Sequence, residues 1–262
     1  MSGVTSDRRA AFKAERADML AFCAGLDPAE WRMDSRAAGW RIQDVVAHLG
    51  AGCRAPFSPL AAKFMRGNDI EVANDLMVDT RRNWSAADVL AEYRRWSGVA
   101  AVVFPLLAAS PLARVQMPLA ELGRFPVRLL PSAMVFDHHT HLRHDMAPAL
   151  GRPAPVTDAN RMTVVLEWMM AVLSNQMRAA TPAWLDHPLA ITLAGPGGGS
   201  WRVGPDGSVA PGSADGSAAQ IDGLALEFPE WGTRRAGWRD RDVRISGDAD
   251  YATAFLDTVN VV

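Results

Sequence analysis

The chain has 262 residues, of which 49% are hydrophobic and 21% are charged, and its formal net charge is −2. This length allows one large domain or two modest ones with a sizeable buried core. The nearly balanced charge gives no electrostatic reason to expect binding to nucleic acid or to an anionic membrane surface.

The N-terminal sequence and the cysteines indicate a cytoplasmic protein. Residues 1–9 lack the apolar stretch of a secretion signal. The two cysteines, Cys23 and Cys53, lie in apolar helical patterns, and we expect both to be buried, reduced thiols. The longest run without charge, residues 96–113, contains Gly98 and Pro105, and we interpret it as a buried helix with its exit loop and not as a membrane span.

Two amphipathic helices are predicted at the start of the chain. Residues 5–26 carry an apolar stripe that includes Phe12 and Met19, with the charged residues expected on the other face. A second helix opens within residues 39–49 and runs towards Phe64 unless Pro56 or Pro59 interrupts it. His48 lies in the middle of the apolar pattern of this second helix, where a core histidine and a metal ligand are both plausible.

The next segment predicts a connector and a third long helix. Residues 67–83 are polar and suggest a connector with a short helical piece. Ser85 and Asp88 have the spacing of a helix-start capping box. The helix that follows is either kinked or ended by Pro105, and residues 117–125 are interpreted as a loop.

Residues 129–145 predict a helix, with Pro131 in its first turn, that carries four of the six histidines. Helical spacing aligns Asp137 with His141, and His141 with Asp145, because residues four apart share a face. His138 and His144 are within reach of the same stripe, whereas His139 is expected at the surface. Two ligands at this spacing can hold one metal ion, with a third from another element, for which His48 is a candidate. Asp145 either orients a ligand histidine or is a surface carboxylate.

The end of the chain predicts a change from helices to a mixed structure. Residues 159–178 form a capped helix, residues 189–194 and 200–203 are strand-like, and the glycine-rich residues 195–199 are a turn and not a phosphate loop. Residues 220–228 and 249–258 are interpreted as helices, with a strand near residues 242–245. The fold class is therefore α+β, with a helical bundle in residues 1–182 and a small α+β module in residues 183–262.

Two segments together carry a family resemblance. The sequence GW-x3-DVVAHL at residues 39–49 is paired with FD-x3-HLR-x-D at residues 136–145. This pairing resembles the DinB-like metal-binding four-helix bundles, and most of all the mycothiol-dependent maleylpyruvate isomerase branch. The tail, with WGTR at residues 231–234, SGD at 246–248 and FLD at 255–257, is similar to the C-terminal module of that branch, which is related to sterol-carrier domains.

The resemblance implies a divalent metal, zinc by expectation, held by His48, Asp137 and His141. The branch usually has Glu where this chain has the shorter Asp137, so His138 or His144 is an alternative ligand. Three protein ligands leave an open position, typical of a catalytic zinc site.

The resemblance also implies an activity. A thiol, mycothiol in the family, would add to a small electrophilic substrate, which is then isomerised or conjugated. Arg143 and the tail arginines Arg234, Arg235 and Arg239 are candidates for binding a carboxylate. The expected partners are thus a small-molecule substrate and a thiol, and the oligomeric state is left open. The alternative is a non-catalytic bundle that binds a metal or a small molecule.

Overall fold

The computed structural model describes residues 6–58 and 69–261. Contacts along the chain form two compact units, one of residues 7–156 and the other mainly of residues 157–262. Helix α7 (Ala159–Ala179), which the sequence interpretation grouped with the bundle, belongs by its contacts to the second unit. The two units are described separately below.

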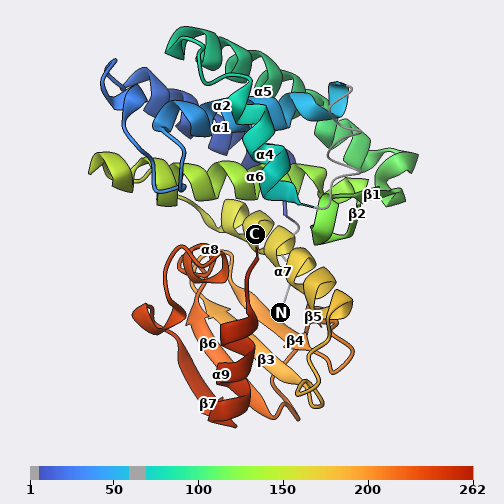
Figure 1. The fold of residues 1–262 in the computed structure, drawn as a ribbon. Coiled ribbons are helices and arrows are strands. Elements are labelled where there is room, and N and C mark those ends of the chain that lie inside the picture. The colour runs from blue at the N-terminus through green and yellow to red at the C-terminus, as the bar shows by residue number, and fades with distance from the viewer. Residues whose placement is uncertain (1–5, 59–68, 262) are drawn as a thin grey trace. The chain divides into compact units, whose positions relative to one another are not determined.

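Four helices form the bundle of the first unit. They are α1 (Arg8–Ala24), α2 (Ile42–Arg54), α5 (Ala86–Ala109) and α6 (Leu130–Thr140). Helix α2 packs against α5 and α6, and α1 packs against α5 and α6, so that the four enclose a common interior (Figure 1). The apolar side chains that were predicted to form stripes along α1 and α2 are buried in this interior.

Helix α2 is buried along almost its whole length. Its first turn is capped by Asp44, which accepts hydrogen bonds from both the backbone N–H and the side chain of Arg41. Ile42, Val45 and Leu49 are fully buried, and burial of each such side chain stabilises the fold by about 1.5–3 kcal/mol. Gly50 allows α5 to approach closely, since a Cβ atom there would lie 3.2 Å from the backbone of Tyr93.

The described part of the segment between α2 and α5 contains a short 3₁₀ turn and one further α-helix. A short 3₁₀ turn (Ala55–Phe57) follows α2, and the predicted continuation of α2 towards Phe64 lies outside the described residues. Helix α4 (Ile70–Asp79) is the short helical piece expected within residues 67–83. Ser85 caps α5 as predicted, and α5 continues through Pro105 to Ala109.

The interpretation of residues 117–125 as a loop was wrong. Two short antiparallel strands, β1 (Gln116–Pro118) and β2 (Arg124–Pro126), lie in this region. Gly123 has a positive φ of 97°, which glycine adopts without strain and which lets the chain reverse just before β2. Phe125 then points into the interior and is buried.

The second unit is built on a five-stranded mixed sheet of order β5-β4-β3-β6-β7. The strands are β3 (Leu189–Ala194), β4 (Gly199–Val203), β5 (Val209–Pro211), β6 (Ala219–Leu224) and β7 (Arg244–Gly247). Only β3 and β6 pair in parallel among the ladders of the described residues. Helix α9 (Ala249–Thr258) contacts β6 and β7, while α7 contacts β5, and α8 (Phe228–Gly232) follows β6 (Figure 1).

The prediction of a helix over residues 220–228 was wrong, because β6 occupies residues 219–224. Ala219 and Ile221 are buried and Gln220 and Asp222 alternate with them, which is the period of a strand. Pairing with β3 on one side and β7 on the other supplies the hydrogen bonds that override the local helical preference. The helical N-terminal region and the following mixed sheet confirm the α+β class.

None of the helices in the described part of the chain combines the length and the apolar character needed to cross a membrane.

Candidate metal centre

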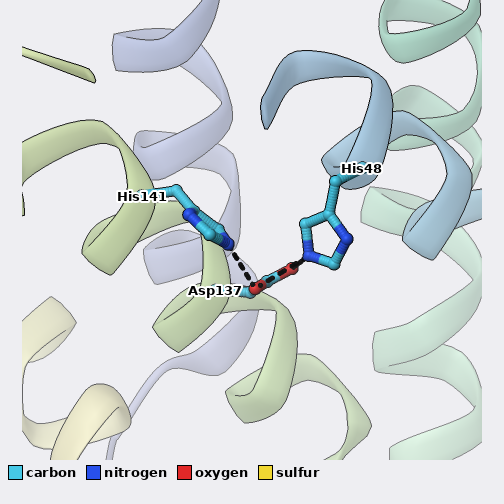
Figure 2. A group of neighbouring side chains, drawn as sticks. All are labelled: His48, Asp137 and His141. Atoms are coloured by element: carbon cyan, nitrogen blue, oxygen red, sulfur yellow. Dashed lines mark hydrogen bonds and ion pairs between the residues drawn. The ribbon is translucent and has the colours of Figure 1, made fainter. Parts of the chain in front are cut away.

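Three side chains from two helices converge in the bundle. The Nε2 atom of His48 lies 3.3 Å from both carboxylate oxygens of Asp137, and the Nε2 atom of His141 lies 3.5 Å from Oδ1 of Asp137. One donor atom from each residue lies within 4.8 Å of the other two, and all three side chains point towards a common region (Figure 2). The group could therefore hold a metal ion.

The donor chemistry fits a small divalent ion. Around a tetrahedral ion with bonds of about 2.1 Å, neighbouring donor atoms lie about 3.4 Å apart. The distances of 3.3 and 3.5 Å between the imidazole nitrogens and the carboxylate match this spacing. Two imidazoles and one carboxylate form a ligand set typical of catalytic zinc sites and of non-haem iron sites.

Each donor owes its place to a local feature of the sequence. His48 lies within the buried stretch of α2. Asp137 lies in α6, and His141 continues the same helix one turn later, so the i, i+4 spacing brings the two side chains together. His141–Met146 then forms a π-helical turn, closed by the hydrogen bond from the N–H of Ala147 to the carbonyl of Leu142. Such turns occur frequently at functional sites.

Asp145 fixes the orientation of His141. The Nδ1 atom of His141 donates to Oδ2 of Asp145 at 2.7 Å, and Asp145 is fully buried. In the neutral imidazole a proton on Nδ1 leaves the lone pair on Nε2, which is the atom that faces Asp137. Of the two alternatives raised by the sequence, a surface carboxylate is wrong because Asp145 is buried, and the contact is the one expected if Asp145 orients His141.

The carboxylate of Asp137 stays ionised in its setting. Burial by itself would raise its pKa, but the neighbouring imidazoles, above all His48, hold the pKa of Asp137 well below its usual range. Asp137 is also the most exposed member of the group, with 23% of its side chain accessible against 7% for His48 and 9% for His141. An incoming molecule would therefore meet the group most easily at the Asp137 edge.

The other histidines of the cluster lie elsewhere. His138 donates from Nδ1 to the carbonyl of Met134 at 2.8 Å and packs edge-on against Phe12, and burial lowers its pKa to about 4. His144 packs near His139, with ring centroids 6.2 Å apart. Neither His138 nor His144 belongs to the convergent group.

The expectation that His139 lies at the surface was wrong. His139 is only 2% exposed and donates from Nδ1 to the carboxylate of Glu15 at 3.0 Å. Glu15 is itself fully buried, although the sequence interpretation placed the charged residues of α1 on its outer face. Its position three residues after Phe12 and four before Met19 puts it on the apolar stripe, which is the signal that could have identified it.

The arginines proposed for substrate binding have structural contacts. Arg143 is buried, donating to Glu15 at 2.5 Å, to Asp18 at 3.0 Å and to the carbonyl of Pro155. In the second unit, Arg234 donates to the carbonyls of Val259 and Asp257 at the end of α9. The contacts of Arg143 describe an internal ion pair, and a substrate-binding role for Arg234 stays a prediction.

Arg239 pairs with Asp257 at 2.9 Å, and Arg235 donates its backbone N–H to the carbonyl of Glu230. Both lie in the second unit, and their proposed part in carboxylate binding also stays a prediction.

We expect Asp145→Ala to weaken metal binding by about 10- to 100-fold, because the loss of an outer partner frees the ligand ring. Asp145→Asn keeps the size of the side chain and an acceptor oxygen, and should lose less. Zinc titration by calorimetry measures both variants. Equal affinity in wild type and Asp145→Ala would show that the contact does not orient the ligand.

Comparisons with known proteins identify the family of the chain. Residues 12–146, slightly more than half of the chain, match the family model of the mycothiol maleylpyruvate isomerase N-terminal domain. No curated protein matches the sequence significantly.

Two solved structures of the mycothiol-dependent maleylpyruvate isomerase have a similar fold. The first matches with a TM-score of 0.58 at 15% identity, and the second, a histidine-to-alanine mutant, with 0.57 at 14%. Each comparison covers 92% of this chain and 93% of the other, so the likeness extends over both units. At these identities the structures establish the fold, and together with the match over residues 12–146 they show that the chain belongs to the mycothiol maleylpyruvate isomerase N-terminal domain family.

Proposed function

We propose that this protein is a metal-dependent enzyme that uses a low-molecular-weight thiol, mycothiol or a close analogue, to isomerise or conjugate a small electrophilic substrate that carries a carboxylate. The observation that carries the proposal is the convergence of His48, Asp137 and His141 in a member of this family. The proposed metal is zinc, and the proposed partners are the substrate and the thiol.

Each residue of the group would have a distinct role in binding the metal. His48 and His141 supply neutral nitrogen donors, Asp137 supplies the negative charge, and Asp145 keeps His141 in the required tautomer. When bound by three protein ligands, a divalent ion would leave room for an exogenous thiol and favour its ionised form. The partial exposure of Asp137 gives that thiol a direction of approach.

The thiol must come from outside the chain. Cys23 and Cys53 are both buried, and burial raises the pKa of the Cys23 thiol to about 12 and that of Cys53 further. Thiols with raised pKa and no access to solvent are poor nucleophiles at neutral pH. An external cosubstrate therefore suits the site better than an internal cysteine.

We expect neither cysteine to react with Ellman's reagent at pH 8 in the folded protein, and both to react after unfolding in guanidinium chloride. The reason is their burial, with 3% of Cys23 and none of Cys53 accessible. The thiol count per chain before and after unfolding gives the result. Rapid labelling of the folded protein would contradict it and would make an internal nucleophile possible.

The activity is tested with maleylpyruvate and mycothiol, and in parallel with monobromobimane as an electrophile for thiol conjugation. We expect turnover that requires both the thiol and a divalent metal, and that is lost in His48→Ala. Metal uptake without thiol-dependent turnover of either probe would favour the alternative of a non-catalytic metal-binding bundle. His187→Ala, which changes an exposed histidine of the second unit, is the matched control.

A further inference from the structure

One aromatic side chain contacts both imidazoles of the candidate metal centre. The ring of Trp40 lies 4.9 Å from that of His48 and 6.0 Å from that of His141, and it is nearly parallel to the second, with an interplanar angle of 27°. Trp40 is only 6% exposed. The tryptophan therefore covers one side of the group, away from solvent.

His48 depends on this contact more than His141 does. His141 has its ring fixed by Asp145, whereas the buried Nδ1 atom of His48 has no hydrogen-bond partner among the described residues. Metal-binding histidines usually have their second nitrogen held by a hydrogen bond. The ring of His48 instead packs against Trp40 on one side and meets the ring of His141 at a steep angle, with centroids 5.1 Å apart.

Trp40 is itself held from two sides. Its carbonyl accepts hydrogen bonds from the backbone N–H and the hydroxyl of Ser35, at 2.9 and 2.8 Å. Gly39, with a φ of 78°, turns the chain immediately before it. At the other end, the indole Nε1 atom donates to Oδ1 of Asp75 at 2.8 Å.

Asp75 links this arrangement to α4. The helix is anchored by Met77 and Val78, which are buried, and by the hydrogen bond from the N–H of Ile70 to Glu121. Asp75 itself is exposed, so its carboxylate has no part in the core. Through its hydrogen bond with the indole, Asp75 connects α4 to Trp40 and thereby to the candidate metal centre.

We propose that Trp40 is the positioning residue for His48, and that Asp75 of α4 holds Trp40 in place. This inference rests on the proposed metal site, because it concerns how a ligand is presented to the ion. It assigns a role to Trp40 beyond filling the core, and a role to α4, which contributes no residue to the convergent group.

The test uses titration of the metal-free full chain with Co²⁺, followed by its visible absorption bands, which report the geometry of the ligands. We expect Trp40→Leu to lower the affinity about 10-fold, the lower end of the range for lost outer partners of a ligand. Asp75→Ala should lower it less, by about 3- to 5-fold, because Asp75 acts one contact further from the ion. Trp40→Phe keeps an aromatic ring but loses the indole N–H, and should resemble Asp75→Ala. Glu71→Ala, on the same helix, is the control and should bind Co²⁺ as the wild type does.

The double variant sharpens the test. Trp40→Phe combined with Asp75→Ala should bind no more weakly than either single variant, because both remove the same hydrogen bond. At saturating Co²⁺ the absorption bands should change in Trp40→Leu and stay unchanged in Glu71→Ala. Because Asp75 is exposed, we expect the Asp75→Ala variant to fold, so the test can be carried out even if Trp40→Leu does not fold.

The outcomes separate this inference from the proposed function. If the wild type binds Co²⁺ through Asp137 but Asp75→Ala and Trp40→Phe bind it equally well with unchanged bands, the positioning role is overturned and the metal site stands. If the losses of Co²⁺ affinity caused by Trp40→Phe and Asp75→Ala add in the double variant, Asp75 does not act through Trp40. The proposed role of Asp75 is then overturned. If the wild type binds no Co²⁺, the proposed metal site fails and the inference fails with it.

Discussion

Asp137→Ala is expected to abolish stoichiometric metal binding, with at least a 100-fold loss of affinity, equivalent to about 2.7 kcal/mol. Asp137 supplies the only carboxylate of the convergent group within the described residues and contacts both imidazoles. Two neutral histidines alone would leave the charge of the ion uncompensated. Elemental analysis of protein purified without chelator, followed by zinc titration, measures the effect.

Thermal unfolding provides a second readout of the same change. A ligand that binds only the folded state stabilises it by about 4 kcal/mol at 1,000 times its Kd. Chelation should therefore lower the Tm of the wild type and leave the Tm of Asp137→Ala unchanged. Full metal content in Asp137→Ala, with His187→Ala as the matched surface control, would show that the ion is held elsewhere.

Glu15→Ala is expected to lower the free energy of unfolding by about 3–5 kcal/mol, the cost of breaking a buried ion pair from one side. Glu15 is fully buried and accepts hydrogen bonds from Arg143 and His139, so its loss leaves a buried guanidinium poorly compensated. These contacts join α1 to the helix that carries Asp137 and His141. Urea unfolding at pH 7 measures the change.

The pH of that measurement matters. Burial opposes ionisation of Glu15, but His139 and Arg143 lower its pKa below the ordinary value of 4.5. A lowered carboxylate pKa gives stability that is complete above pH 4.5 and is lost as the pH falls through the folded-state pKa. At pH 7 the whole effect of the substitution is therefore visible.

Two controls test the ion-pair explanation. The double variant Glu15→Leu with Arg143→Met should recover part of the loss, because it removes the uncompensated guanidinium and fills the space with apolar groups, while His139 and Asp18 each still lose a partner. Arg244→Ala breaks an exposed pair with Asp242 and should cost no more than about 1 kcal/mol. A Glu15→Ala variant as stable as the wild type would contradict the role given to the buried pair.

Local patterns in the sequence were sufficient for the long helices and for two of the three donors of the candidate metal group. The stripe of α2 and the capping of α5 by Ser85 depend on residues three or four apart, so they are visible without any tertiary contact. The same spacing paired Asp137 with His141. The third donor, His48, was a candidate because it lies within the apolar pattern of the second helix. The family resemblance then paired it with Asp137 and His141, because spacing within one helix contains no information about another helix.

Charged residues within the bundle were harder to place. Nothing in the spacing of His139 shows that it would meet Glu15, a residue 124 positions away. Arg143 likewise has the residue type of a substrate-binding group, and its contacts are set by α1. A charged side chain is buried only where another element supplies its partner, and that partner is invisible to a local pattern.

What the sequence determined by itself was therefore the helical periodicity of the first unit, the fold class, and the two segments that carry the donor residues. The tertiary structure decided that β6 is a strand, because its pairing with β3 and β7 outweighs local preference. It also decided that Trp40 lies against both imidazoles. Periodicity describes the face that a segment buries, whereas the identity of the groups on the opposing face depends on how distant elements pack.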